Sequence, residues 1–325
     1  MKILVTPVSL CKNKDSEAIK ILKEFADEIV FNPYERALKE DEIIPLLDNV
    51  DGYIAGVDFI SAKVIEAAPP TLKVISRYGV GIERVDIVAA GKKGIVVTNT
   101  PGVYADSVAE MTIGLMLAVC RKIPYLNNET KKGNWPKELG IELSGKTLGI
   151  IGLGSIGKRV AIRAKAFSMK VIAYDLFFDE KFLKKYQIEK CSFEELIKKA
   201  DIITLHLPLT DKTYHIIDKK AIEKMKNGVI LINTSRGGLI DEKALFGALK
   251  SGKIGGVGLD VFENEPPGIL PLFEFENVIV TPHTSSHTKE VVEKMGIMAV
   301  RNLIDVLTKN ECNFIVNREY LGALG

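Results

Sequence analysis

The segment from Lys146 to Asp175 constrains the fold of this 325-residue chain more than any other. An apolar run of strand length leads into the glycine turn Gly152-Leu153-Gly154-Ser155-Ile156-Gly157, a helix-like segment follows, and a second apolar run ends at Asp175. A strand, a G-x-G-x-x-G turn, a helix and a second strand ending in an acid form the dinucleotide-binding fingerprint of the Rossmann fold. Glycine turns also arise by chance, but both strands and the acid in register favour dinucleotide binding.

Each part of the turn has a physical role in holding a pyrophosphate. Gly152 permits the tight turn, Gly154 lets the main chain approach the pyrophosphate, and Gly157 lets the helix pack close to the strand. Ser155 and Ile156 begin the helix, where free amides and the positive end of the helix dipole attract phosphate oxygens.

Asp175 indicates which dinucleotide binds. It follows Gly157 by 18 residues, which places its carboxylate where it can accept hydrogen bonds from the adenosine ribose hydroxyls. An ionised carboxylate about 4 Å from a 2′-phosphate would repel it by a few kcal/mol. The next residues, Leu176 and Phe177, offer no base to reverse this. We therefore expect NAD rather than NADP.

Length and composition favour a soluble globular protein of two domains, each large enough for its own core. A net charge of +2, from 44 basic and 42 acidic residues, gives no reason to expect nucleic acid or a membrane as a partner. The four cysteines form no C-x-x-C pair, as is typical of reduced cytoplasmic thiols. The apolar region Met111–Cys120 is too short to span a bilayer, and the first residues fit a strand better than a signal peptide.

Residues 1–100 alternate strand and helix patterns, which predicts a parallel α/β unit without a phosphate-binding glycine turn of its own. The strand candidates are Lys2–Pro7, Gly52–Val57, Leu72–Ser76 and Ile95–Thr98, and the helical patterns are Asp15–Ala26, Ser61–Ala68 and Glu83–Ala90.

Residues 107–122 form a nearly all-round apolar helix, which must be buried between domains or against a partner subunit. We expect Pro124 to end it and residues 127–145 to form a polar connection. The six strand candidates that follow match a complete Rossmann sheet. They are Thr147–Ile151, Val171–Tyr174, Asp201–Leu207, Val229–Asn233, Gly256–Val261 and Val278–Thr281. A long amphipathic helix, Lys289–Lys309, comes next.

Five polar residues lie at or just past the ends of these strands: Asp175, His206, Arg236, Asp260 and His283. Ligands of open parallel sheets bind at the carboxyl ends of the strands, so one crevice could gather all five. A structural protein would have little reason to place so many polar groups at one edge.

His283 suits proton transfer, because an ordinary imidazole titrates near physiological pH. A loop histidine with a structural role is the alternative. The spacing of His283 and His287 could also suggest a metal pair, but the H-E-x-x-H glutamate is missing and Pro282 argues against a helix, so we expect no metal. Arg236 either makes a surface salt bridge or serves as a fork for a carboxylate. Glu265 matters only if the fold brings it to His283.

Together these residues resemble the D-isomer-specific 2-hydroxyacid dehydrogenase family, and most of all its D-3-phosphoglycerate dehydrogenase branch. The resemblance covers nearly the whole chain. Its motifs are SRYGVGIERVDI (76–87), NTPGVYADSVAE (99–110), GKTLGIIGLGSIG (145–157), HLPLT (206–210), NTSRGGLID (233–241), GLDVFENEP (258–266) and TPH (281–283).

The resemblance implies roles for particular residues. Arg236, Glu265 and His283 match the family's catalytic triad. Thr234 and Asp260 would lie near the nicotinamide, and His206 and Pro208 beside the cofactor, although His206 could equally be a packed strand-end residue. His215 is expected to be structural. The main chain of Val80 and Gly81 would hold the substrate carboxylate, and Arg77 could meet a phosphate.

The resemblance also implies an architecture. A flavodoxin-like α/β substrate-binding domain would comprise residues 1–100 and 288–325, and an NAD-binding Rossmann domain residues 101–287. The apolar helix after Pro101 would cross between the domains and contribute to a homodimer or larger homo-oligomer. Because the chain stops at residue 325, we expect no appended regulatory domain.

One departure from the phosphoglycerate dehydrogenase pattern concerns the substrate. That branch usually carries an arginine in a V-R-S segment, and the corresponding residues here, 54–58, contain no base. D-3-phosphoglycerate is the predicted substrate; the alternative is a glyoxylate or hydroxypyruvate reductase or another D-2-hydroxyacid dehydrogenase. A formate- or phosphite-type oxidoreductase has little support. An NADH-sensing binding protein is the alternative from a different class.

Overall fold

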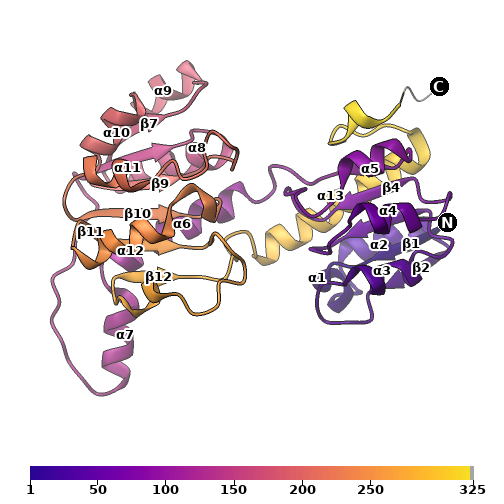
Figure 1. Ribbon diagram of the computed structural model, residues 1–325, viewed down its shortest axis with the longest axis horizontal. Helices are drawn as coiled ribbons and strands as arrows, with labels where there is room; N and C mark the ends of the chain where they lie inside the picture. The colour runs from indigo at the N-terminus through magenta and orange to yellow at the C-terminus, as the bar shows by residue number, and fades with distance from the viewer. Residues whose placement is uncertain (323–325) are drawn as a thin grey trace. The chain divides into compact units, whose positions relative to one another are not determined.

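The computed structural model describes residues 1–322, and it divides the chain into two compact units (Figure 1). Unit 1 comprises Met1–Val103 together with the described residues from Thr288 onward, and unit 2 comprises Tyr104–His287. Each unit is built on its own parallel sheet, which confirms the predicted α/β fold class.

Unit 1 contains a five-stranded sheet in which every neighbouring pair is parallel. The strand order, β2-β1-β3-β4-β5, is the flavodoxin-like order, as predicted. The strands are β1 (Lys2–Val5), β2 (Glu28–Phe31), β3 (Gly52–Ala55), β4 (Val74–Arg77) and β5 (Val96–Thr98).

Helices cover both faces of this sheet and bury two apolar clusters against it. They are α1 (Val8–Lys12), α2 (Glu17–Phe25), α3 (Glu40–Leu46), α4 (Ala62–Ala67), α5 (Ile87–Lys92) and α13 (Lys289–Lys309), followed by the short 3-10 helix η3 (Arg318–Tyr320). Helix α13 returns from the far end of the chain and packs on α2 and β4. Ser76 donates to the Ala299 carbonyl at 2.7 Å, and Asn302 Nδ2 donates to the Asn99 carbonyl at 2.9 Å.

Three elements of unit 1 differ from the sequence-based expectation. Strand β2 and helices α1 and α3 were not predicted, because each is at most seven residues long and carries too few apolar positions for a clear period. Helix α5 begins at Ile87 rather than Glu83, since Asp86 caps it by accepting from the Ala89 amide at 2.8 Å.

Unit 2 contains a seven-stranded parallel sheet in the order β12-β11-β10-β9-β6-β7-β8. Counted within the unit, this is the doubly wound Rossmann order with a seventh strand, as expected for the predicted fold. The strands are β6 (Thr147–Ile151), β7 (Lys170–Tyr174), β8 (Glu189–Lys190), β9 (Ile202–Leu205), β10 (Val229–Asn233), β11 (Ile254–Leu259) and β12 (Val278–Val280). The prediction of six strands missed β8, because this edge strand is two exposed charged residues.

The helices of unit 2 are α6 (Ala105–Cys120), α7 (Ile123–Lys131), α8 (Ser155–Ala166), α9 (Glu180–Tyr186), α10 (Phe193–Lys199), α11 (Lys219–Lys224), α12 (Glu242–Lys250) and the 3-10 helices η1 (Gly237–Leu239) and η2 (Pro271–Glu274). In Figure 1, α7 and the loop after it stand apart from the sheet. None of the helices in residues 1–322 is long and apolar enough to cross a membrane.

Helix α6 is the apolar helix of the sequence, and α8, β10 and β11 of the same unit cover it. Two glycines of β11 make this close packing possible: a Cβ at Gly256 would lie 2.5 Å from Val119, and one at Gly258 would lie 3.0 Å from Leu115. The predicted end at Pro124 was wrong. The helix ends at Cys120, and Pro124 lies in the first turn of α7, where the missing N–H of proline is tolerated.

Candidate active site

The glycine turn joins β6 to α8 and has the shape that a pyrophosphate requires. Gly152 has a φ of +98°, and a Cβ at Gly157 would lie 2.1 Å from the Gly152 carbonyl oxygen. A Cβ at Gly154 would meet nothing within 4 Å, so the main chain is open there. Gly154 caps α8 without any side-chain hydrogen bond, which leaves the first amides of the helix, from Ser155 and Ile156 onward, for phosphate oxygens.

Asp175 lies directly beside this turn, at the end of β7. Its carboxylate accepts hydrogen bonds from the amides of Leu153 at 2.6 Å, Leu176 at 2.6 Å and Phe177 at 3.2 Å. These bonds fix the carboxylate next to the glycine turn. Oδ1 accepts two of these bonds and Oδ2 one, so Oδ2 keeps a lone pair that can accept from a ribose hydroxyl.

His206 directly follows β9, which pairs with β6 on the side opposite β7. Its amide donates to the Ile151 carbonyl at 2.8 Å, and a Cβ at Gly152 would lie 2.7 Å from the His206 carbonyl carbon. The ring bonds Thr204 Oγ1 through Nε2 at 3.0 Å, and burial lowers the pKa of His206 to about 3. Its buried Nδ1 has no partner within residues 1–322. The neutral imidazole is therefore a packed neighbour of the turn. Pro208 follows, and its carbonyl accepts from Thr213 Oγ1 at 2.7 Å.

Asp260 organises the loop that carries His283. The buried carboxylate accepts from Thr281 Oγ1 at 2.5 Å and from the amides of Thr284 and Ser285, both at 2.9 Å. The His283 amide donates to the Asp260 carbonyl at 2.8 Å. Four hydrogen bonds thus tie the end of β11 to the loop after β12.

Arg236 and Thr234 belong to the turn after β10. The Thr234 hydroxyl shares a hydrogen bond of 2.9 Å with Thr112 of α6, and Arg236 Nη1 donates to the Ser235 carbonyl at 2.8 Å. Gly237 brings this turn against the chain after β11, because a Cβ there would lie only 1.8 Å from the Phe262 carbonyl carbon. This main-chain contact places the Arg236 turn beside the segment that leads to Glu265.

Glu265 and His283 meet in unit 2. Glu265 Oε2 and His283 Nδ1 lie 2.7 Å apart, and Glu265 Oε1 accepts from the Phe262 amide at 3.1 Å. The His283 side chain is 46% exposed, and its Nε2 has no partner in the part of the chain that the structure describes. A carboxylate on Nδ1 fixes the tautomer and stabilises an imidazolium, so Nε2 can exchange a proton with a ligand. No group of three or more metal-ligating His, Cys, Asp or Glu side chains occurs within residues 1–322.

The predicted substrate residues belong to unit 1: Arg77 is the last residue of β4, and Val80 and Gly81 lie in the loop that follows. Asn99, which the residue patterns did not single out, supports this loop by donating from Nδ2 to the Val80 carbonyl at 3.1 Å. Arg77 is only 7% exposed, and Nη1 donates to the carbonyls of Ala55 and Tyr78. The amides of Val80 and Gly81 make no hydrogen bond within residues 1–322.

Asp58 is a buried carboxylate that the sequence analysis did not single out. It accepts from the amides of Leu38 at 2.7 Å and Gly56 at 3.1 Å, from the Tyr53 hydroxyl at 3.2 Å and from Thr6. These donors connect the ends of β1 and β3 to the start of α3. Asp58 therefore stabilises unit 1. No residue pattern reveals this, because the donors are scattered along the chain.

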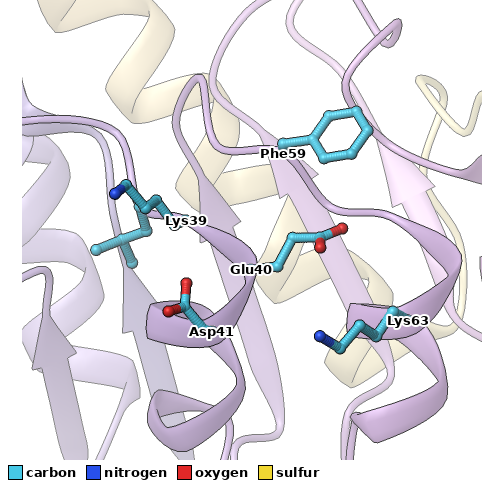
Figure 2. Close-up of a pocket in the computed structure, with 6 residues that line it drawn as sticks. Lys39, Glu40, Asp41, Phe59 and Lys63 are labelled. Atoms are coloured by element: carbon cyan, nitrogen blue, oxygen red, sulfur yellow. The ribbon is translucent and has the colours of Figure 1, made fainter.

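A separate hollow of about 600 Å³ lies in unit 1 beside α3 and α4. Figure 2 shows the basic side chains of Lys39 and Lys63 and the acidic side chains of Glu40 and Asp41 around it, with Phe59. The opposite charges balance, so the hollow does not select an anion.

The family model that matches the chain is described as D-isomer specific 2-hydroxyacid dehydrogenase, NAD binding domain, and it covers residues 113–285. These residues include the glycine turn, Asp175 and the pair of Glu265 and His283. The chain belongs to the D-isomer specific 2-hydroxyacid dehydrogenase family. Its members are NAD-dependent oxidoreductases, and the open glycine turn and Asp175 fit NAD.

Two curated relatives of this dehydrogenase carry different names. D-3-phosphoglycerate dehydrogenase from Methanocaldococcus jannaschii is 43% identical over all of this chain, which spans only 62% of that relative's length. Hydroxypyruvate reductase from Thermotoga maritima is 43% identical and is matched over 90% of this chain and 95% of its own length. The two names agree on the reaction class and differ on the substrate.

A solved structure of the family supports both the fold and the cofactor. D-lactate dehydrogenase from Aquifex aeolicus, complexed with NAD and lactic acid, superposes with a TM-score of 0.81. It is 32% identical, and the match covers 95% of this chain and 96% of that structure.

Proposed function

We propose that this dehydrogenase interconverts a D-2-hydroxy acid and its 2-keto acid with NAD as the redox partner. The observation that carries the proposal is the pair of Glu265 and His283, whose Oε2 and Nδ1 atoms lie 2.7 Å apart at the carboxyl edge of the NAD-binding sheet. Such a pair moves protons, and oxidation of an alcohol requires removal of the hydroxyl proton.

Each residue then has a defined task. When bound, NAD supplies the ring carbon that accepts the hydride from C2 of the hydroxy acid. His283 Nε2 takes the hydroxyl proton during oxidation and returns it to the carbonyl oxygen during reduction. Glu265 stabilises the imidazolium between these steps. Arg236 orients the carboxylate and carbonyl, and the amides of Val80 and Gly81 bind the carboxylate.

D-3-phosphoglycerate is the substrate that the sequence motifs favour, and the relative from M. jannaschii supports it. One specific observation favours the second candidate, an unphosphorylated acid such as D-glycerate or glycolate. Arg77, the base expected to meet a phosphate, is buried and bonded to main-chain carbonyls. The name of the T. maritima relative agrees with this alternative.

We also propose that the enzyme is a cytoplasmic homodimer or larger homo-oligomer. All four cysteines are free thiols, which suits a reducing compartment. Helix α7 and the loop after it expose four apolar side chains, Ile123, Trp135, Leu139 and Ile141, of which Leu139 is 92% exposed. Such a surface is typical of a protein interface.

The experiment follows NADH oxidation with 3-phosphohydroxypyruvate, hydroxypyruvate, glyoxylate and pyruvate, and repeats the best acid with NADPH. We expect turnover of at least one acid and, because of Asp175, a preference for NADH of roughly a hundredfold or more. His283→Ala should lower kcat at least about a hundredfold while NADH affinity stays nearly unchanged. His287→Ala, in the same loop, is the matched control and should behave like the wild type.

Two outcomes would contradict the proposal. Unchanged turnover in His283→Ala would remove His283 from the reaction. Tight NADH binding by the wild type without turnover of any 2-keto acid would favour an NADH-sensing binding protein instead.

A further inference from the structure

The loop after β4 is held on two sides by main-chain and side-chain hydrogen bonds. The Gly79 amide donates to Thr100 Oγ1 at 3.0 Å, and the Gly79 carbonyl accepts from the Thr100 amide at 2.9 Å. Asn99 Nδ2 holds the Val80 carbonyl at 3.1 Å. The carbonyls of Gly79 and Val80 are therefore bonded, while the amides of Val80 and Gly81 remain available to a ligand.

The side chain of Arg77 supports a third side of this loop. Its Nη1 donates to the Tyr78 carbonyl at 2.5 Å, within the loop, and to the Ala55 carbonyl at 3.3 Å, at the end of β3. The guanidinium also lies against Gly79, whose Cβ, if present, would be 3.2 Å from Nη1 and 3.4 Å from Cζ. Gly79 has a φ of +143°, which a larger residue would rarely adopt, so glycine leaves room for both the turn and the guanidinium.

The burial of this guanidinium bears on its role, because a buried charge is costly unless hydrogen bonds or opposite charges compensate it. Burial lowers the pKa of Arg77, and the nearby carboxylates of Asp58 and Glu83 act in the opposite direction. The oxygens of Asp58 already accept from the ends of β1 and β3, as described above. Both bonds come from Nη1, and the buried Nε has no partner within residues 1–322. Arg77 thus links the end of β3 to the loop after β4 through two carbonyl groups, with a planar guanidinium whose shape and reach a lysine ammonium does not reproduce.

We propose that Arg77 is a positioning residue: its guanidinium holds Gly79, Val80 and Gly81 in the shape in which the Val80 and Gly81 amides bind the carboxylate common to all 2-keto acids. Arg77 acts through the loop and does not bind the part of the substrate beyond C2. This inference rests on the proposed function, in which those amides bind the substrate.

Glyoxylate distinguishes a role of Arg77 in positioning the loop from a role in binding the substrate beyond C2. The 2-oxo carbon of glyoxylate carries only hydrogen, so this acid has no further group for Arg77 to bind. If Arg77 positions the loop, Arg77→Lys and Arg77→Met should both raise the KM for glyoxylate, by roughly five- to tenfold, since loss of the ordering bonds weakens carboxylate binding. The KM for 3-phosphohydroxypyruvate should rise by the same factor wherever the wild type accepts that acid. The value of kcat should change less than KM, and NADH affinity should stay at the wild-type value.

A second measurement does not depend on turnover. Amide hydrogen exchange of the segment from residue 78 to 86 should be faster in Arg77→Lys and Arg77→Met than in the wild type, while exchange in unit 2 stays the same. Arg84→Met is the matched control, because Arg84 is an exposed arginine that follows the same loop. It should leave both the exchange and the KM for glyoxylate within about twofold of the wild type.

An unchanged KM for glyoxylate combined with a raised KM for the phosphorylated acid would overturn the inference and make Arg77 a phosphate ligand. Unchanged hydrogen exchange in both Arg77 variants would overturn it as well. If the wild type reduces none of the acids, the proposed function fails, and the exchange comparison still decides whether Arg77 holds the loop. Should Arg77→Met fail to fold, as judged by loss of amide protection throughout the strands of unit 1, the lysine variant carries both tests.

Discussion

His206 should make the stability of unit 2 depend on pH. Burial lowers the pKa of this histidine from 6.5 to about 3, so the folded ring stays neutral where an unfolded one takes up a proton. The unfolded state therefore binds more protons, and stability falls as the pH drops through 6.5. Between pH 7.5 and 5.5 the loss amounts to about 1.4 kcal/mol, and this value requires only that the folded pKa stay below about 4.5.

Urea unfolding of the wild type and His206→Gln at both pH values would measure this loss. Glutamine keeps a polar group for Thr204 and cannot take up a proton, so every other titrating group cancels in the comparison. We expect the wild type to lose about 1.4 kcal/mol more than the variant on acidification. An NMR titration provides a direct check, because the chain has four histidines and the His206 ring signals should not move between pH 8 and 5. Equal losses in both proteins, or a ring that titrates near pH 6.5, would refute the reasoning.

Two further predictions concern packing and assembly. Gly237→Ala should destabilise unit 2 by about 1–3 kcal/mol, because the new methyl group meets main chain rather than a flexible side chain. Gly247→Ala, in open space on α12, is the control and should be neutral or stabilising. Equal effects of the two substitutions on thermal unfolding would contradict this explanation. If the loop after α7 mediates self-association, Trp135→Glu combined with Leu139→Glu should shift sedimentation toward the monomer. Ile269→Glu, at an exposed position elsewhere in unit 2, is the control and should leave sedimentation unchanged. An unchanged oligomer in the double variant would exclude that loop as the interface.

The sequence predicted the features of this fold that depend on local pattern. Long buried strands such as β10 read as continuous apolar runs, and the spacing from Gly152 to Asp175 follows from the geometry of one strand-turn-helix-strand unit. The edge strands β2 and β8 were missed because both are short and have no buried residue, so neither carries a periodic signal. These two strands form because the neighbouring strand has main-chain N–H and C=O groups available for hydrogen bonding.

Side-chain direction was harder to predict than position along a strand. Placing Glu265 beside His283 required the resemblance, because 18 residues separate the two and only the tertiary fold brings them to 2.7 Å. Arg77 and Asp260 show the opposite case. Both stand at strand ends, where ligand contacts are expected, yet both bind main-chain groups of their own unit. At a strand end, an ionised side chain can bind a ligand or fix the loop that does, and residue type does not distinguish the two.

The distribution of groups between the units bears on how substrates can vary in this family. Arg236, Glu265 and His283 all belong to unit 2, where Gly237 and Asp260 fix the loops that carry them, so the proposed proton-transfer pair lies wholly within the unit that carries the NAD-binding turn. The proposed substrate loop belongs to unit 1 and offers only main-chain amides, which recognise a carboxylate and are indifferent to what lies beyond C2. Changes in unit 1 can then alter the preferred acid without disturbing the pair of Glu265 and His283. Relatives of similar identity named for phosphorylated and unphosphorylated substrates are what such a division would produce.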